Sequence, residues 1–407
     1  MNKLRFKDFN GQQFPEWEIV ELEKVSTKVN QKNKELTLNN VLTNSATQGI
    51  ISQSDYFERD IANQNNLGGY YIVQTNDFVY NPRISIHALV GPIKRNNLTK
   101  GVMSPLYTVF RFKEGDLDFF EQYFQTNHWH DYMKSVSNSG ARYDRMNITN
   151  ESFFGLPLPY PSIPEQTKIA NFLTAVDEKI SHLTQKHDLL TQYKKGVMQQ
   201  IFSQELRFKD DDGQDFPEWD EKTLKELIDT VIDNRGKTPP VESAGNPLIE
   251  VNAIGNKDVK YSAITKYVSD ETYQSWFRNH IREGDVLFST VGATAQCSYF
   301  KDVGLKATIA QNIVGLRFKP TYSSLFMFYL LTEKNNNQKF KTIEMGAVQP
   351  SVKVSQMIHL HFNFPSQEEQ TKIASFLTAI DDKITATQTQ LQAVKQYKKG
   401  LLQQMFV

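Results

Sequence analysis

The sequence has little of what a disulfide-stabilised, metal-binding or membrane-spanning protein needs. Its 407 residues include a single cysteine, Cys297, which cannot form an internal disulfide or a multi-cysteine zinc site. No run of about eighteen apolar residues is present, which argues against a membrane span. The first residues also lack the apolar core of a signal peptide. A reducing cytoplasm is therefore the expected location.

An excess of charge of one sign is also missing, because 46 Lys plus Arg balance 46 Asp plus Glu. This balance argues against a histone-like binder that depends on bulk positive charge, but a local basic face could still bind DNA. In that case the acidic residues must lie elsewhere, or another subunit must supply positive charge.

Complete catalytic motifs are absent as well. The stretch 235–238 contains Gly-Lys-Thr, but Val231 stands where a phosphate-binding loop needs its first glycine. No GxGxxG turn supports a nucleotide or S-adenosylmethionine site. Residues 81–84, Asn-Pro-Arg-Ile, begin like the Asn-Pro-Pro-aromatic motif of amino-group methyltransferases but lack its second proline and its aromatic ring. No cysteine–histidine cluster suggests a metal site. These absences favour a binding protein over an enzyme.

The most informative feature that the sequence does have is an internal duplication. Residues 4–17, LRFKDFNGQQFPEW, match residues 206–219, LRFKDDDGQDFPEW, at eleven of fourteen positions. Residues 165–180 match residues 369–384 at thirteen of sixteen positions, and the decapeptides YKKGVMQQIF and YKKGLLQQMF end the two copies. Three matches in the same order show one unit written twice, with a divergent module between the shared segments of each copy.

The shared segment after each module predicts a long helix. Its apolar residues recur mostly at alternating steps of four and three, which is typical of a coiled-coil seam. Because neither helix can bury its own stripe, we expect the two helices to pack on each other as an antiparallel coiled coil. The seam residues are Ile169, Leu173, Val176 and Ile180 in the first copy and Ile373, Leu377, Ile380 and Ile384 in the second.

The two modules are predicted to be α/β, with mixed α+β content. Echoes between them, such as Asn76-Asp77 and Gly284-Asp285, indicate one fold with two different surfaces. Strands are predicted at 69–73, 106–112, 285–288 and 313–318, and helices around 117–136 and 321–341. The predicted division is a first module at 1–162, a first helix at 163–204, a second module at 205–366 and a second helix at 367–407.

The repeated segments resemble those of the specificity subunits of type I restriction-modification enzymes. The resemblance rests on the helix opening Glu-Gln-Thr-Lys-Ile-Ala-x-Phe-Leu-Thr-Ala, the entry sequence Phe-Pro-Glu-Trp and the exit sequence Gln-Tyr-Lys-Lys-Gly, each present twice. It covers the whole chain in the expected order, although the modules themselves are variable in this family.

The resemblance implies that each module is a target recognition domain that reads one half of a bipartite site in double-stranded DNA. The paired helices would set the spacing and dock two methyltransferase (modification) subunits, with restriction subunits added for cleavage. This chain would have no catalytic site and no cofactor, and S-adenosylmethionine, Mg and ATP would belong to the partner subunits. Two alternatives stay open, namely a stand-alone nuclease with an unrecognised site and a coiled-coil scaffold.

Candidate DNA contacts lie in polar loops rich in Arg, Lys, Asn, Gln and Tyr, because these side chains meet phosphates and base edges. The loop at 139–145 and its positional counterpart at 346–353 share a glycine but differ in their polar groups. Any one candidate could instead be a solvated surface residue. The pairs Lys194-Lys195 and Lys398-Lys399 could touch DNA or favour the helix C-termini, and the second interpretation is preferred. The candidates are Asn81, Arg83, Lys94, Arg95, Arg142, Tyr143 and Arg145 in the first module, and Asn234, Arg235, Lys237, Thr238, Gln349 and Lys353 in the second.

Overall fold

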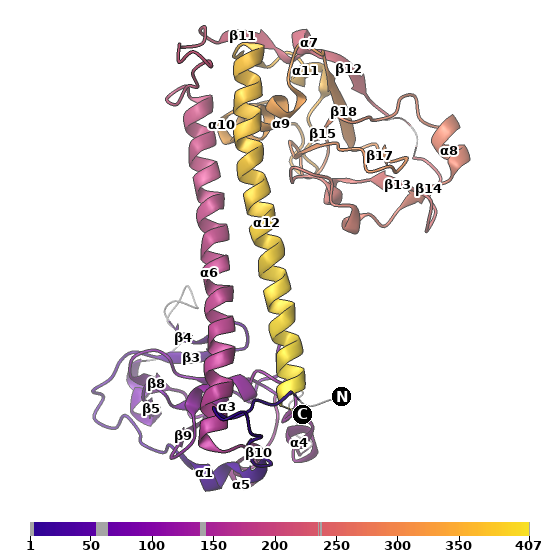
Figure 1. Cartoon of the computed structure of the whole chain (residues 1–407). Helices are drawn as coiled ribbons and strands as arrows, with labels where there is room; N and C mark the ends of the chain where they lie inside the picture. The colour runs from indigo at the N-terminus through magenta and orange to yellow at the C-terminus, as the bar shows by residue number, and fades with distance from the viewer. Residues whose placement is uncertain (1–3, 54–63, 139–143, 235, 237, 407) are drawn as a thin grey trace. The chain divides into compact units, whose positions relative to one another are not determined.

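Two compact units make up the chain in the computed structural model. Unit 1 is Met1–Thr184 together with Thr389–Val407, and unit 2 is Gln185–Gln388. The two long helices, α6 (Ile163–Phe202) and α12 (Gln367–Met405), therefore each contribute residues to both units (Figure 1). We call the residues before α6 module 1 and those between the two helices module 2. The structure describes residues 4–53, 64–138, 144–234, 236 and 238–406.

Ion pairs define the direction of the two helices. In unit 1, Lys398 of α12 donates to Asp177 of α6 at 2.6 Å. In unit 2, Lys194 of α6 donates to Asp381 of α12, also at 2.6 Å. Asp177, which comes earlier in α6 than Lys194, is paired with the later residue of α12. The two helices therefore run in opposite directions, and the predicted antiparallel pairing is confirmed. The interpretation of Lys194 and Lys398 as helix C-terminal charges is wrong, because each side chain is bonded to an aspartate of the other helix.

Both modules are built on a four-stranded antiparallel sheet with the same strand order. The order is β2-β9-β6-β7 in module 1 and β12-β18-β15-β16 in module 2. Side chains alternate between the two faces of a strand, so Phe78 and Phe110 join the aromatic core beside the helices. Val79 and Val109, on the opposite face, pack with the small strand pairs of module 1. The structure thus has a helix layer, a central sheet and a layer of short strands.

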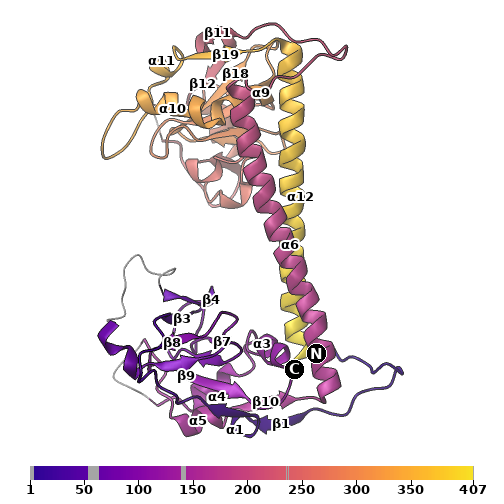
Figure 2. The same cartoon turned by 90° about the vertical axis from the view of Figure 1, so that its left-hand side faces the viewer.

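The elements of module 1 are short. Figure 2 shows α3 between the sheet of module 1 and the helix ends of unit 1. The elements are β1 Glu18–Glu21, α1 Leu22–Val25, β2 Ser26–Lys28, β3 Leu42–Ser45, β4 Gly49–Ser52, η1 Gln64–Gly69, β5 Tyr71–Val73, β6 Phe78–Tyr80, β7 Ile93–Arg95, β8 Gly101–Met103, β9 Thr108–Phe112, α3 Leu117–Tyr123, α4 His130–Ser135, α5 Asn150–Phe154 and β10 Pro157–Tyr160.

Module 2 follows the same plan with additional short elements. They are β11 Asp220–Thr223, α7 Leu224–Leu227, β12 Ile228–Ile232, β13 Asn246–Ile249, η2 Val251–Ala253, η3 Tyr261–Ala263, β14 Tyr267–Val268, α8 Asp270–Ser275, β15 Val286–Ser289, β16 Cys297–Tyr299, β17 Thr308–Ile309, β18 Ile313–Phe318, α9 Ser324–Thr332, α10 Lys334–Thr342, α11 Val354–Met357 and β19 His361–Phe364. The strand after each entry segment pairs with the strand that leads into the long helix, β1 with β10 and β11 with β19.

The echo between Asn76-Asp77 and Gly284-Asp285 has a structural cause. Asn76 and Gly284 both have a positive φ, 74° and 89°, a conformation that glycine and asparagine tolerate better than other residues. The buried carboxylate of Asp77 then accepts from Arg111, and that of Asp285 accepts from Arg317. These matched turns show that the two modules share one fold.

The predicted strands correspond to observed ones, with shifted ends, but each predicted module helix is two helices. The helix predicted around 117–136 is interrupted between α3 and α4, where the Trp129 indole is buried and donates to Thr126 O at 3.0 Å. The helix predicted around 321–341 is interrupted at Glu333, whose side chain caps α10. Across the described ranges, no helix is long and apolar enough to cross a membrane.

Candidate nucleic-acid interface

The start of α6 is bound by the entry segment of module 1. Arg5 donates from Nε and Nη2 to the two carboxylate oxygens of Glu165, at 3.1 and 2.8 Å, and Trp17 Nε1 donates to Glu165 Oε2 at 3.0 Å. The Glu165 side chain has no exposed surface. Hydrogen bonding to Glu165 raises the pKa of Arg5, which therefore stays charged and compensates the buried carboxylate. We call these three residues the anchoring cluster.

Unit 2 contains the same anchoring cluster, formed by Arg207, Trp219 and Glu369. The two Arg207 bonds to Glu369 measure 2.9 and 3.0 Å, and the Trp219 bond measures 3.1 Å. Glu369 is also fully buried. The cluster explains why the entry segment and the helix opening repeat together, since each supplies one side of the same buried ion pair.

The glutamine after each buried glutamate connects the helix to its own module. Gln166 donates to Pro161 O at 2.8 Å and accepts at 2.8 Å from the backbone N–H of the residue that caps α3. Gln370 donates to Pro365 O at 2.9 Å and accepts at 3.1 Å from the backbone N–H of the residue that caps α9. The repeated Glu-Gln dipeptide thus fixes the helix start against its module in both units.

Two candidate loops of module 1 lie side by side. Segments 82–84 and 144–146 exchange two backbone hydrogen bonds, of 3.0 and 2.9 Å. In module 2, segments 290–292 and 350–352 exchange the same two bonds, at 2.9 and 2.8 Å. We call each pair of segments the loop frame. Its geometry is shared by the two modules, as the positional match between the loops predicted.

The side chains on the loop frame differ between the modules. Arg83 and Arg145 face each other across the bridge in module 1, whereas Val291 and Ser351 occupy these positions in module 2. The Arg83 side chain is 64% exposed, and its Nε lies 3.9 Å from Asp144. Guanidinium groups can bond guanine or phosphate, whereas valine offers only apolar contact. The same backbone geometry therefore carries charged side chains in module 1 and uncharged ones in module 2.

The loop of module 2 ends in an exposed apolar tip. Gly346 has φ +90°, and a Cβ there would lie 2.8 Å from Gln349 O, so a glycine is required at this turn. Val348, at the tip, is fully exposed. The candidates Arg142, Tyr143, Arg235 and Lys237 lie outside the described residues.

Two further candidates are engaged within module 1. Asn81 donates to Asn44 O at 3.0 Å, and its side-chain oxygen accepts from Arg83 N at 3.0 Å. Arg95 donates to Asn76 Oδ1 and is ion-paired with Asp118 and Glu121, so only 14% of its side chain is exposed. In the free protein both side chains hold local structure.

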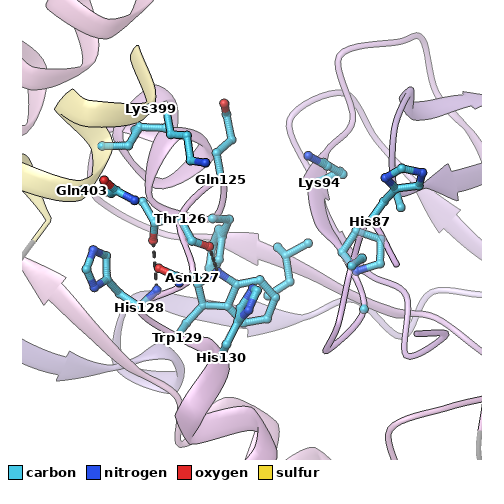
Figure 3. A pocket seen from close by; sticks show the side chains of 17 residues that line it. His87, Lys94, Gln125, Thr126, Asn127, His128, Trp129, His130, Lys399 and Gln403 are labelled. Carbon is cyan, nitrogen blue, oxygen red and sulfur yellow. Dashed lines mark hydrogen bonds between the residues drawn. The ribbon is translucent and has the colours of Figure 1, made fainter. Parts of the chain in front are cut away.

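Lys94 lines a hollow of about 480 Å³ in unit 1, which we call the helix-side hollow. Figure 3 shows Lys94 and His87 on one side of it, and Lys399 and Gln403 of α12 on the other. Burial lowers the pKa of Lys94, an effect that Glu121 opposes and Lys398 adds to.

A hollow at the matching place in unit 2 is lined by Lys195, Met198 and Gln199, the counterparts of Lys399, Leu402 and Gln403 in the repeat. Because repeated residues line both hollows, the helix-side hollow belongs to the shared frame.

A different hollow, of about 610 Å³, lies on module 2 beside its loop frame, and we call it the loop hollow. It brings together Thr238 and Gln349, two candidates that lie 111 positions apart in the sequence. Gln311 and Asn312 line it too, and sequence analysis missed them. The sequence could have indicated them, because two amide residues stand just before the predicted strand at 313–318.

The two other described candidates of module 2 do not line the loop hollow. Asn234 donates to Asn279 O at 3.4 Å. Lys353 is exposed and caps the short helix α11. Within the described part of the chain, no group of three His, Cys, Asp or Glu residues is arranged to hold a metal ion.

Residues 15–192 and 217–396 match the family described as "Type I restriction modification DNA specificity domain". The two matches cover most of the chain, so the chain belongs to this family. The type I restriction enzyme MjaVIII specificity subunit of Methanocaldococcus jannaschii is 21% identical over 266 residues, which are 63% of this chain and 62% of that protein. The match thus spans less than two thirds of that relative.

Two solved structures share the fold over nearly the whole chain. The S subunit of a type I restriction-modification system from M. genitalium is 13% identical with a TM-score of 0.59, covering 100% of this chain and 99% of its own. A chain from a structure on complex assembly and conformational transition of the type I R-M system is 15% identical with a TM-score of 0.56, covering 97% and 98%. The predicted architecture of two modules and two long helices is confirmed.

Proposed function

We propose that this chain is the DNA sequence-recognition subunit of a type I restriction-modification complex. Each module reads one half of a bipartite site in double-stranded DNA. The observation that carries the proposal is the loop frame, which has one backbone geometry and two sets of side chains. Two readers of unequal half-sites require this combination, since base edges are distinguished by side-chain chemistry.

The repeated parts fit a second role, which is to present equal surfaces to equal partners. In the proposal, two methyltransferase subunits dock on the paired helices, and restriction subunits join them for cleavage. The chain itself is non-catalytic and cytoplasmic, and S-adenosylmethionine, Mg and ATP are bound by the partner subunits. The family membership of both modules supports this assignment.

The test is to express the chain with its modification subunits in cells that lack other DNA methylation, and to sequence the methylated motifs. We expect one bipartite motif, with unequal halves and a fixed spacer. Methylation without sequence preference, or none at all in an assembled complex, would contradict the proposal. DNA cleavage by the purified chain alone would instead favour the nuclease alternative.

The spacer has its own test, because α6 and α12 are continuous helices of 40 and 39 residues. Inserting a whole number of turns into both helices should lengthen the spacer and leave the two half-sites unchanged. An unchanged spacer in an active complex would refute the role of the helices as a ruler.

A further inference from the structure

A second loop is built the same way in both modules, namely the turn that precedes the central strand. In module 1 it is the turn 104–107, closed by a 3.1 Å bond from Tyr107 N to Ser104 O. In module 2 it is the turn 310–313, closed by a 3.1 Å bond from Ile313 N to Ala310 O. Both turns enter the strands that carry the matched arginines, β9 and β18. They are therefore equivalent positions of one fold.

In module 2 this turn is tied to the loop frame. Thr290 donates to Asn312 O from both its backbone nitrogen, at 2.9 Å, and its hydroxyl, at 3.2 Å. The carbonyl of the same Thr290 accepts from Val352 N in the loop frame. A single residue thus joins the two loops and holds them next to each other.

The two central side chains of the turn in module 2 are amides that face the loop hollow. Gln311 Nε2 donates to Thr238 Oγ1 at 3.3 Å, which orients its amide beside a predicted DNA contact. Asn312 Oδ1 is enclosed and has no hydrogen-bond partner within the described residues. An unpaired buried acceptor is destabilising, and because this oxygen is enclosed, a donor from a partner reaches it only when the Asn312 side chain turns outward.

The equivalent positions in module 1 have the opposite character. Pro105 and Leu106 replace the two amides, and the Leu106 side chain is 60% exposed. A proline and an exposed leucine cannot donate side-chain hydrogen bonds to a base. They can make apolar contact with a thymine methyl group.

We propose that this turn is a second base-reading loop, and that Gln311 and Asn312 are specificity-determining residues for the second half-site. Asparagine and glutamine amides pair with the N6 and N7 edge of adenine in the major groove, so these residues read adenine. Leu106 makes the corresponding apolar contact in the first half-site. The inference rests on the proposed function and assigns the readers within it.

The test uses the full chain with its modification subunits, and methylated motifs as the readout. In the variant Gln311→Ala/Asn312→Ala, the preference for adenine at one or two positions of the second half should fall by roughly tenfold to a hundredfold. The first half should stay unchanged. In the reciprocal variant, Pro105→Gln/Leu106→Asn, the base preference should change in the first half of the motif only. Glu271→Ala, an exposed residue of module 2 that does not line the loop hollow, is the matched control and should change nothing.

A near-isosteric variant covers the case in which the alanine variant does not fold. Gln311→Met keeps about the same side-chain length at this exposed position, removes the amide without adding a charge, and should also lose the preference for adenine. An unchanged methylated motif in these variants, or an equal loss of methylation at all sequences, would overturn the inference. The proposed function would still stand if the wild-type complex methylates a bipartite motif. A wild-type complex that methylates no bipartite motif would overturn both.

Discussion

The anchoring cluster and the loop frame differ in what the duplication has kept. In the anchoring cluster, backbone and side chains are the same in both units, since Arg5 and Arg207 bond Glu165 and Glu369 in the same way. In the loop frame only the backbone is the same. Buried, paired charges tolerate little change, whereas an exposed side chain on a fixed backbone, such as Arg83, can be exchanged at little cost in stability. The comparison separates residues that hold the fold from residues that meet a partner.

The largest effect should come from the anchoring cluster. Replacing Glu165 with Ala leaves the Arg5 guanidinium without its buried partner, and should lower the free energy of unfolding of unit 1 by about 3–5 kcal/mol. Glu369→Ala should cost unit 2 a similar amount. Denaturant titration of each variant measures both losses. Glu16→Gln is the control, because Glu16 also contacts Arg5 but is 92% exposed. A loss in only one unit would show that the two clusters are not equivalent.

The phenylalanine at the end of each repeated helix segment offers a second comparison. Phe406 is buried against Phe119 and Tyr123, at ring distances of 5.3 and 5.7 Å, whereas its counterpart Phe202 is only partly buried, 5.6 Å from Phe326. Phe406→Ala should therefore destabilise unit 1 by about 3–5 kcal/mol, and Phe202→Ala should destabilise unit 2 by less. Thermal unfolding of the two variants measures the two losses of stability. Equal losses in the two units would contradict the prediction.

The loop frame should respond in specificity and not in stability. Arg83→Ala and Arg145→Ala should each relax the first half-site, by about 1–3 kcal/mol for a lost base contact, and leave the second half unchanged. Val291→Ala and Ser351→Ala are the matched changes in module 2 and should affect the second half only. The loss of binding free energy for each base change is measured by titrating DNA variants with the assembled complex. An equal loss on all sequences would identify the arginines as phosphate contacts.

The ion pairs between the helices should give the smallest effect. Asp381 is 13% exposed and also accepts from Tyr329 at 2.7 Å, whereas Asp177 is 38% exposed and also accepts from Gln122 at 2.8 Å. A double-mutant cycle on Lys194 and Asp381 should therefore give about 1–2 kcal/mol of coupling. The cycle on Lys398 and Asp177 should give less than about 1 kcal/mol, because solvent screens the pair. A larger coupling free energy for Lys398 and Asp177 would mean that the exposure of the aspartate does not set the strength of these ion pairs.

The sequence predicted the duplication and the two long helices because these depend on repeats and local periodicity. It did not predict the role of Glu165, which appeared only as the first residue of the repeated helix opening. Its partner Arg5 lies 160 positions away, and no local pattern reports such a contact. Gln311 and Asn312 could have been singled out as two amides before the predicted strand at 313–318, but their place beside Thr238 depends on the fold. The single predicted helix in each module failed where a short break is stabilised by Trp129 or by the cap at Glu333.

The order in which the chain is made has a consequence for unit 1. Unit 2 is one uninterrupted stretch of sequence, whereas unit 1 also needs Leu401, Met405 and Phe406 for its core. During synthesis the ribosome therefore completes the residues of unit 2 first, although unit 1 was begun earlier. The aromatic core around Phe119 therefore stays open until Leu401, Met405 and Phe406 have been added. A chain truncated before Leu401 would leave the core of unit 1 incomplete.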